Sequence, residues 1–180
     1  DTIDAANYKD YVLPVMFLKY LSDSYADAVE ALSKQYSGIR LERQKKYLPF
    51  MVAEGCSFYD LYKQRFADNI GQLINAAMRQ IEADNNQQLA GVLSSVDYNS
   101  ENALGTREHK NAILRDLLED FEPLNLRPSV IEIKEGQVPA AVIGDAYEYM
   151  IGQFASMAGK KAGSFYTPAA VSEIMARIVN

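Results

Sequence analysis

The sequence predicts a mainly α-helical, multi-helix domain, and three observations favour this fold class. Long stretches place apolar residues three and four positions apart, which is the spacing of one face of a helix. Segments with the alternating pattern of a β-strand are few and short. The 180 residues are 48% hydrophobic and 23% charged, values typical of a globular domain with a buried core.

The first predicted helix runs from Ala5 to about Tyr36. Its apolar face consists of Tyr11, Val15, Leu18, Tyr25, Val29 and Leu32. Asp4 or Asn7 is a candidate N-cap, and Gly38 is a candidate C-terminal cap. Pro14 lies inside the pattern, so we expect a kink or a delayed helix start there.

Three shorter segments follow the first helix. Arg40–Lys46 is predicted to be a charged connector exposed to solvent. Tyr47–Val52 contains Pro49, which favours an extended arm or an edge strand over a central strand. Phe58–Gln64 is predicted to be a short helix.

The clearest helical periodicity lies in Phe66–Ala83. The apolar positions of this stretch are Ile70, Leu73, Ile74, Ala77, Met78 and Ile81. Asn85-Asn86 is a stop signal, and Leu89–Val96 is predicted to add a helical turn or two. Tyr98–Thr106 is polar and rich in turn residues, and Arg107–Phe121 is predicted to be helical.

The last third of the chain carries one strand signal and two helix signals. Val130–Ile133 is a candidate short strand, and a helix is expected over Pro139–Met157. Gly159–Gly163 forms a flexible basic loop, after which the final helix begins at Pro168. The apolar positions of these two helices are Ile143, Tyr147, Met150, Ile151, Phe154, Val171, Ile174, Met175, Ile178 and Val179.

Charge and cysteine content restrict the classes of function. The formal net charge is −6 with no basic stripe, so the chain is a poor DNA binder on its own, because affinity for DNA rests on Lys and Arg. Cys56 is the only cysteine and His109 the only histidine, which excludes an internal disulfide and a His/Cys metal site. A purely carboxylate metal site stays open, though no spacing supports it. No apolar run is long enough to cross a bilayer and no signal peptide opens the chain, which fits a cytoplasmic protein.

The segment Gly163-Ser164-Phe165-Tyr166-Thr167-Pro168 has the pattern of a helix start. Thr167 is the predicted N-cap and Pro168 the first helical residue. The free amides of the first turn and the positive end of the helix dipole make such a start a site for a carboxylate or phosphate. Phe165 and Tyr166 add flat apolar surface. The alternative is a loop-to-helix junction whose aromatic side chains anchor it to the core.

Four stretches resemble type I modification methyltransferases in the same order. Lys160–Pro168 is similar to the loop that precedes the catalytic domain, and Gly144–Ala155 to the helix that leads into it. Asn7–Lys9 with Val12–Asp23 resembles the opening helix of that family. Ile81–Glu82 with Leu89–Leu93 fits the same layout, whereas Pro14 and the insertion-like Asn125–Val138 depart from it.

The resemblance implies a helical amino-terminal domain over residues 1–157. Residues 158–180 would be the loop and first helix of an α/β methyltransferase domain that uses S-adenosylmethionine. One wall of the cofactor pocket would be formed by Ser164, Phe165, Tyr166, Thr167, Pro168 and Ala169. Lys160 and Lys161 would contact a DNA phosphate or form a solvated loop. The glycine-rich loop and the Asn-Pro-Pro-aromatic motif of the family are not in this sequence, so no catalytic residue is assigned; both are expected to follow Asn180.

The activity implied is methyl transfer from S-adenosylmethionine to adenine N6 in DNA, with the target base flipped out of the helix. The implied partners are DNA, a specificity subunit and a restriction subunit, and a second copy of the chain is a further candidate. These 180 residues alone are expected to be inactive. A cytosine N4 enzyme could share this layout. The chain could instead be a non-enzymatic helical adaptor, or part of a methyltransferase fused to a nuclease.

The remaining candidates have simpler interpretations. His109 is predicted to be a surface residue and Cys56 a structural thiol. Four tyrosines are candidates for a subunit interface, namely Tyr20, Tyr47, Tyr59 and Tyr62. The acidic residues Glu119, Asp120 and Glu122 are predicted to form a solvated helix end.

Overall fold

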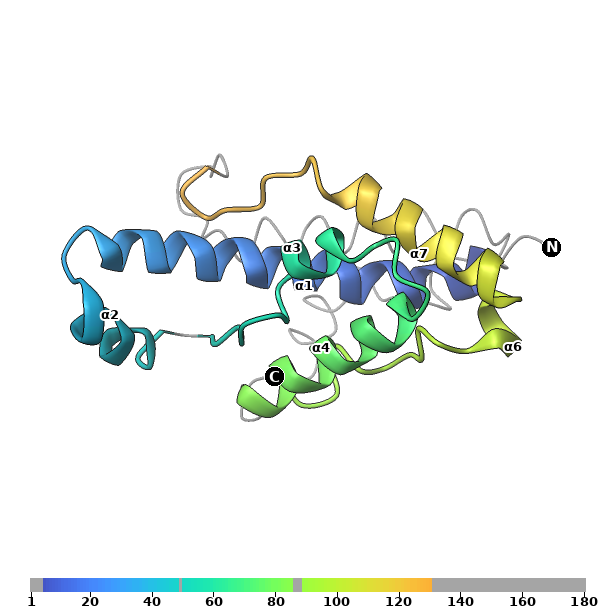
Figure 1. Cartoon of the computed structure of the whole chain (residues 1–180), viewed down its shortest axis with the longest axis horizontal. Coiled ribbons are helices and arrows are strands. Elements are labelled where there is room, and N and C mark those ends of the chain that lie inside the picture. Colours follow the sequence, from blue (N-terminus) through green and yellow to red (C-terminus); the bar gives the residue numbers. More distant parts are fainter. Residues whose placement is uncertain (1–4, 49, 86–88, 131–180) are drawn as a thin grey trace, which may run out of the picture. The chain divides into compact units, whose positions relative to one another are not determined.

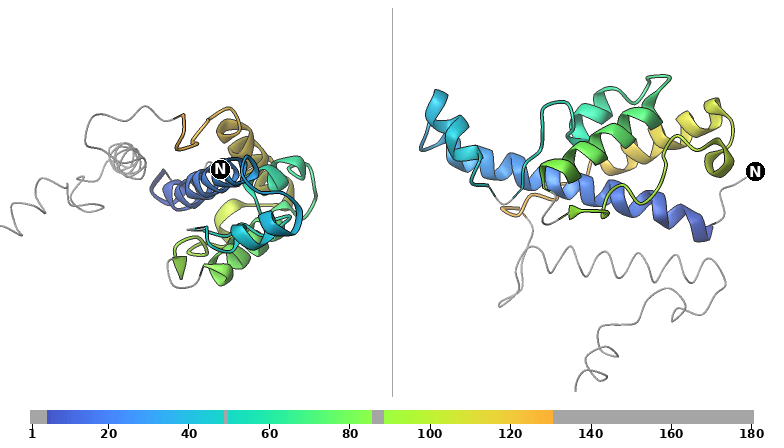
Figure 2. Two further views of the ribbon diagram at one scale, coloured as in Figure 1. Left: turned by 90° about the vertical axis from the view of Figure 1, so that its left-hand side faces the viewer. Right: turned by 90° about the horizontal axis from the view of Figure 1, so that it is seen from below.

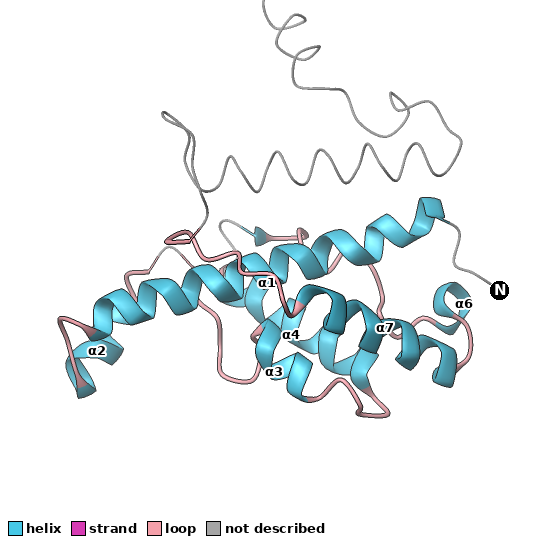
Figure 3. Ribbon diagram, turned by 90° about the horizontal axis from the view of Figure 1, so that it is seen from above, coloured by secondary structure: helices cyan, strands magenta, loops and turns pink. Residues whose placement is uncertain are grey.

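The computed structural model describes residues 5–48, 50–85 and 89–130, and it describes side chains from residue 10 onward. Within these ranges every regular element is a helix, and no strand is present (Figure 3). The prediction of a mainly α fold is therefore confirmed. The helices predicted over Pro139–Met157 and from Pro168, and the loop between them, lie outside the described residues. Apart from the first residues of α1, the elements described below belong to one compact unit, Tyr11–Glu132.

Helix α1, Ala5–Ser33, is the longest element, and its 29 residues span about 44 Å at 1.5 Å per residue. It begins at Ala5, so the delayed start at Pro14 is wrong, and Asn7 lies within the helix and is not its cap. Proline removes a backbone hydrogen bond and normally costs about 3 kcal/mol in a helix interior. Here every residue from Tyr11 to Met16 is buried, and this packing on several sides offsets that cost.

The end of α1 and the start of α2, Gly38–Lys45, differ from the sequence prediction. The Ser33 hydroxyl donates to the Glu30 carbonyl at 2.7 Å, and the Tyr36 amide donates to the Leu32 carbonyl at 2.9 Å. Two of the last carbonyls of α1 thus find donors before residue 38. Gly38 is therefore not the C-cap of α1; it has a φ of 54° and is the first residue of α2. The predicted charged connector is this short helix, and it buries no residue, so its exposure to solvent is confirmed.

Helices α3, Phe58–Lys63, and α4, Ile70–Asp84, pack against each other and against α7, Arg107–Phe121 (Figure 1). A capping box starts α3, in which Ser57 and Asp60 each satisfy the other's backbone amide. The predicted apolar face of α4 is buried except for the half-buried Leu73. The helix begins four residues later than predicted, because residues 64–69 form successive turns. The bounds predicted for α7 are those observed, and Thr106 caps its start.

Residues 90–106 form a loop, made mostly of turns, that crosses between α4 and α7. Of the helical turns predicted at Leu89–Val96, only Leu89 is helical, and its amide donates to the Asn85 carbonyl at 3.0 Å; residues 90–96 are irregular turns. The Glu82 carboxylate accepts hydrogen bonds from the amides of Leu93 and Ser94 at 2.6 and 2.8 Å, which holds this loop in a non-helical path. In the stretch predicted to be turns, α6, Glu101–Leu104, is one short helical turn.

Tyr98 anchors the loop to α1. Its side chain is fully buried, its hydroxyl donates to the Tyr11 carbonyl at 2.7 Å, and its ring meets the Tyr11 ring edge-on at 5.4 Å. Its carbonyl oxygen lies so close to Gly71 of α4 that a Cβ there would overlap it. Glycine at this position therefore allows the loop to lie directly against α4.

The extended arm predicted over Tyr47–Val52 forms hydrogen bonds with a side chain and not with a strand. The side-chain oxygen of Asn85 accepts from the backbone amide of Met51, and the side-chain nitrogen of Asn85 donates to the Met51 carbonyl, both at 2.8 Å. It also donates to the Ile81 carbonyl at 2.7 Å. Asn85 thus ends α4, as the sequence predicted, and satisfies the backbone of the arm in the way that a neighbouring strand would.

Candidate functional site

The residues predicted to bind the cofactor and DNA lie outside the described part of the chain. This holds for the pocket wall of Ser164, Phe165, Tyr166, Thr167, Pro168 and Ala169, and for Lys160 and Lys161. Their roles stay predictions. The described residues contain three other groupings of polar or charged side chains that could serve function, and each is built below from its contacts.

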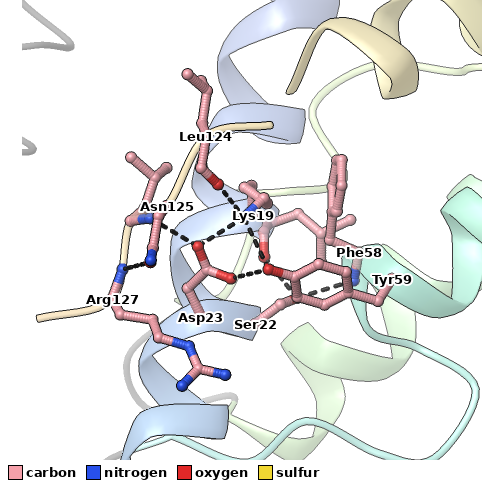
Figure 4. Close-up of polar contacts among 10 residues, drawn as sticks. Lys19, Ser22, Asp23, Phe58, Tyr59, Leu124, Asn125 and Arg127 are labelled. Atoms are coloured by element: carbon pink, nitrogen blue, oxygen red, sulfur yellow. Dashed lines mark hydrogen bonds and ion pairs between the residues drawn. The ribbon is translucent and has the colours of Figure 1, made fainter. Parts of the chain in front are cut away.

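The first grouping is a buried ionic cluster centred on Lys19 and Asp23 of α1 (Figure 4). The two residues are one helical turn apart, and Lys19 Nζ lies 2.6 Å from Asp23 Oδ2. Both side chains are fully buried. Charges removed from water in this way are tolerated only when other hydrogen bonds complete their coordination. The remaining contacts of the pair show how this is done.

Helix α3 supplies part of that coordination. The Tyr59 hydroxyl donates to Asp23 Oδ1 at 2.6 Å and accepts from Lys19 Nζ at 2.9 Å. Burial, followed by the hydrogen bond to Asp23, raises the pKa of Tyr59 above its ordinary value. One residue earlier, the Phe58 amide donates to the Ser22 hydroxyl at 2.8 Å. The start of α3 is therefore fixed to the middle of α1.

The segment after α7 supplies the remaining hydrogen bonds to Lys19 and Asp23. The Leu124 carbonyl accepts from Lys19 Nζ at 2.5 Å, and the Leu126 amide donates to Asp23 Oδ2 at 2.7 Å. Lys19 therefore has three acceptors and Asp23 three donors, drawn from three separate parts of the chain (Figure 4). The cluster has the properties of a structural junction, since all its groups are paired and neither charged side chain reaches solvent.

Two further acidic residues, nearer the C-terminal end of α1, also bind the segment that follows α7. Asp27 accepts from the amide and the hydroxyl of Ser129 at 2.9 and 2.6 Å. Glu30 pairs with Arg127 at 2.9 Å. We call Asp23, Asp27 and Glu30 the acidic ladder. It holds residues 124–129 alongside α1 although that segment has no secondary structure of its own.

The second grouping lines a surface cavity of about 280 Å³ between α7 and the turn before α4. Its arginines are Arg65, Arg107 and Arg115, and each pairs with an acidic neighbour at 2.9 to 3.3 Å. Arg65 also stacks on the rings of Tyr62 and Phe66. Because each arginine here has an acidic partner, the cavity carries less net positive charge than its three arginines alone would give.

The third grouping is the exposed side of α2. Arg40, Arg43 and Lys46 are three residues apart and all exposed, and we call them the basic face of α2. Ile39 and Tyr47 flank this face and are 75% and 82% exposed. Within the described ranges, no acidic side chain forms an ion pair with Arg40, Arg43 or Lys46; the nearby Glu42 pairs with Lys45 at 2.7 Å. Sequence analysis missed this face because it treated the segment as a connector, although the three-residue spacing was visible.

The minor candidates have the surroundings of structural residues. His109 is exposed on the first turn of α7. Burial raises the pKa of the Cys56 thiol, the opposite of what an activated thiolate needs. Three of the four tyrosines considered for an interface make internal contacts: Tyr59 in the ionic cluster, Tyr62 on Arg65, and Tyr20 stacked on Phe17 at 6.3 Å. Tyr47 alone among these four projects into solvent.

The described residues contain neither a group of three potential metal ligands nor a helix long and apolar enough to cross a membrane. The acidic residues at the end of α7 are largely exposed, as predicted, and Glu119 pairs with Arg65.

Comparison with known proteins gives two family matches along the chain. Residues 1–121 match the HsdM N-terminal domain, and residues 139–180 match the N-6 DNA methylase family.

Curated relatives match nearly the whole chain. The methylase subunit of the type I restriction enzyme MpnII from Mycoplasma pneumoniae is 26% identical over 98% of this chain and 36% of its own length. Two methylase subunits from Methanocaldococcus jannaschii, MjaVIII and MjaIX, are 27% and 22% identical over 94% and 99% of this chain and 28% and 32% of their own lengths. The chain thus spans about a third of the length of these relatives.

Proposed function

Because the chain belongs to the HsdM N-terminal domain family of type I restriction enzyme methylase subunits, we propose that it is the amino-terminal part of a DNA methyltransferase. The reaction would be transfer of the methyl group of S-adenosylmethionine to N6 of adenine in DNA. The observation that carries the proposal is the order of the two matches, a helical domain over 1–121 followed by the start of a methylase domain from residue 139.

The described helices supply structural support to this reaction and no chemistry. The ionic cluster has no open position for a substrate, and the acidic ladder fixes the path of residues 124–129 before the methylase match begins. We propose that α1, α3 and α7 form a rigid support from which the chain continues into the methylase domain. The domain boundary at residues 157/158 is part of this proposal.

The cofactor is proposed to bind against the start of the final helix. Ser164–Ala169 would form one wall of the pocket, with the amides after Thr167 facing the carboxylate of S-adenosylmethionine. Lys160 and Lys161 would contact a DNA phosphate. The partners proposed are DNA, a specificity subunit, a restriction subunit and a second copy of the chain, in the cytoplasm.

The test uses the full-length protein that carries this chain, assembled with its specificity subunit. Methyl transfer from labelled S-adenosylmethionine to DNA is measured, and digestion of the product to nucleosides distinguishes N6-methyladenine from N4-methylcytosine. Absence of any transfer would overturn the proposed activity, and N4-methylcytosine would overturn the choice of base.

The pocket wall is tested with two matched helix-cap variants. Thr167→Ala is expected to weaken S-adenosylmethionine binding by roughly tenfold or more, because the amides of that helix start would be displaced. Thr106→Ala removes the side-chain cap of α7. This control should lower stability by about 1 kcal/mol while leaving cofactor affinity unchanged. Equal cofactor affinity in both variants, measured by calorimetry, would show that Thr167 is only a cap.

A further inference from the structure

We propose that the basic face of α2 binds the phosphate backbone of a DNA duplex. This inference rests on the proposed function, and it names the surface of the helical domain that meets the DNA. The observation that directs attention to α2 is the distribution of charge. Residues 34–46 contain five basic residues and one acidic residue and so carry a formal charge of +4, whereas the rest of the chain carries −10.

The positive charge is concentrated on one side of the helix. Residues 39, 40, 43, 46 and 47 recur at the three- and four-residue spacing of a single helix face. The helical path extends to them because the Tyr47 amide donates to the Gln44 carbonyl at 3.0 Å. The opposite side, which carries Leu41, Gln44, Lys45 and Leu48, is half-buried. The exposed face therefore holds Arg40, Arg43 and Lys46, and the exposed Glu42 lies at its edge, where it pairs with Lys45.

These cations are free to bind a ligand. Glu42 lies off the basic face and pairs with Lys45. Lys34, at the end of α1, is 73% exposed and lies 3.8 Å from Glu30, whose carboxylate is shared with Arg127. By contrast, the arginines of the surface cavity are neutralised by acidic neighbours. Among the described residues, the basic face is thus where an anionic polymer would gain the most from ion pairing.

The position of α2 suits a long, rod-shaped partner. It lies beyond the C-terminal end of α1, away from the group formed by α3, α4 and α7 (Figures 2 and 3). A duplex can therefore contact α2 without meeting the acidic residues of α3, α4 and α7. The flanking Tyr47 and Ile39 add apolar surface that can pack on the sugar edge of a backbone.

Phosphate contacts by arginine and lysine position a protein on DNA without reading its sequence. Arg40, Arg43 and Lys46 would therefore contribute affinity and orientation. Choice of site would remain with another part of the assembly. The three side chains would neutralise about three phosphates, so their loss should reduce the salt dependence of binding by an amount that can be measured.

The test compares two triple variants of the full-length protein in complex with its specificity subunit. Arg40→Gln/Arg43→Gln/Lys46→Gln removes the basic face. Lys63→Gln/Arg79→Gln/Arg107→Gln makes the same change in charge at exposed residues of α3, α4 and α7. Binding to a labelled duplex of about 30 base pairs is followed by fluorescence anisotropy between about 50 and 200 mM salt.

In the variant that lacks the basic face, the plot of log association constant against log salt concentration should be less steep by about 2.7, because three phosphate contacts are lost. Binding should also be at least tenfold weaker. In the control variant the steepness of the same plot should fall by less than about 1. The variant Arg40→Lys/Arg43→Lys keeps all three positive charges and should therefore bind the duplex as the parental protein does. Equal slopes for the two triple variants would overturn the proposal. Loss of the specificity subunit from the complex, with the slope unchanged, would also overturn it and identify the face as a protein contact.

The same preparation separates this proposal from the proposed function. If the parental protein shows the expected slope but transfers no methyl group, the methyltransferase proposal fails and the basic face stands. If it methylates DNA with no difference between the variants, only the basic face is excluded. A parental protein that does not bind duplex DNA would exclude both.

Discussion

The buried pair Lys19–Asp23 allows a sharp test of how the helical domain is held together. In Lys19→Met the Asp23 carboxylate stays buried and loses its counter-charge, and in Asp23→Leu the same happens to the Lys19 ammonium. Removing one partner of a buried pair costs about 3 to 5 kcal/mol. The free energy of unfolding of such a domain is itself only about 5 to 15 kcal/mol, so each single change should be severe.

The double variant is expected to be less damaging than the sum of the singles. With both charges gone, the remaining cost is that of the Tyr59 hydroxyl, the Leu124 carbonyl and the Leu126 amide, which lose their partners. At about 1 kcal/mol each, this amounts to about 3 kcal/mol, compared with about 6 to 10 kcal/mol for the two singles together. A double-mutant cycle should therefore give a coupling energy of about 3 kcal/mol or more.

The assay is urea unfolding of the full chain, followed by far-ultraviolet circular dichroism at constant temperature and pH. If a single variant does not fold, Tyr59→Phe provides the smaller step. It removes only the hydroxyl that bridges the pair and should cost about 1 to 2 kcal/mol. Effects of the two single changes that add to within about 0.5 kcal/mol would refute the reasoning, because they would mean that the two side chains do not depend on each other.

Three further predictions concern the loops around α4. The carboxylate of Glu82 has a lowered pKa: burial opposes ionisation, but hydrogen bonds from the loop outweigh it. The contribution of Glu82 to the free energy of unfolding should be complete above the ordinary pKa of a glutamate and should be lost as the pH falls through the lowered pKa. A Glu82→Gln variant whose unfolding in acid is the same as that of the parental protein would contradict this. Asn85→Ala should cost about 2 kcal/mol, since the amide and carbonyl of Met51 lose their partner, whereas an unchanged urea midpoint would exclude that role. Gly71→Ala should cost about 2 kcal/mol or more because its Cβ would overlap the Tyr98 carbonyl, and a neutral effect in thermal unfolding would mean that the loop can shift freely.

The amphipathic helices could be predicted closely from sequence, because their burial has the periodicity of a helix. The bounds of α7 and the buried face of α4 were both correct. The irregular regions were predicted less well. Residues 89–96 contain apolar side chains at helical spacings, but the Glu82 carboxylate of the preceding helix α4 binds the amides of Leu93 and Ser94 and fixes the loop in another path.

The two charged groupings show what residue patterns alone did not reveal. Lys19 and Asp23 stand one turn apart in an otherwise apolar stretch of α1, which is a signal for a buried pair, but their partners near residues 59 and 124–126 could not be found from local spacing. The spacing of Arg40, Arg43 and Lys46 was visible in the sequence, but the segment was interpreted as a charged connector, and the net charge of −6 averages this basic segment with a strongly acidic remainder. The predicted cofactor loop at 164–169 lies outside the described residues and stays a prediction.

The acidic ladder has a consequence for how this protein can vary in length. Leu126 and Ser129 donate their amides to carboxylates one helical turn apart, Asp23 and Asp27. Inserting or deleting a single residue between the two amides would leave one carboxylate without its donor, although the segment has no helix or strand to disrupt. Loops usually accept such changes with little penalty. In this stretch the number of residues between Leu126 and Ser129 should therefore be more restricted than in an ordinary surface loop.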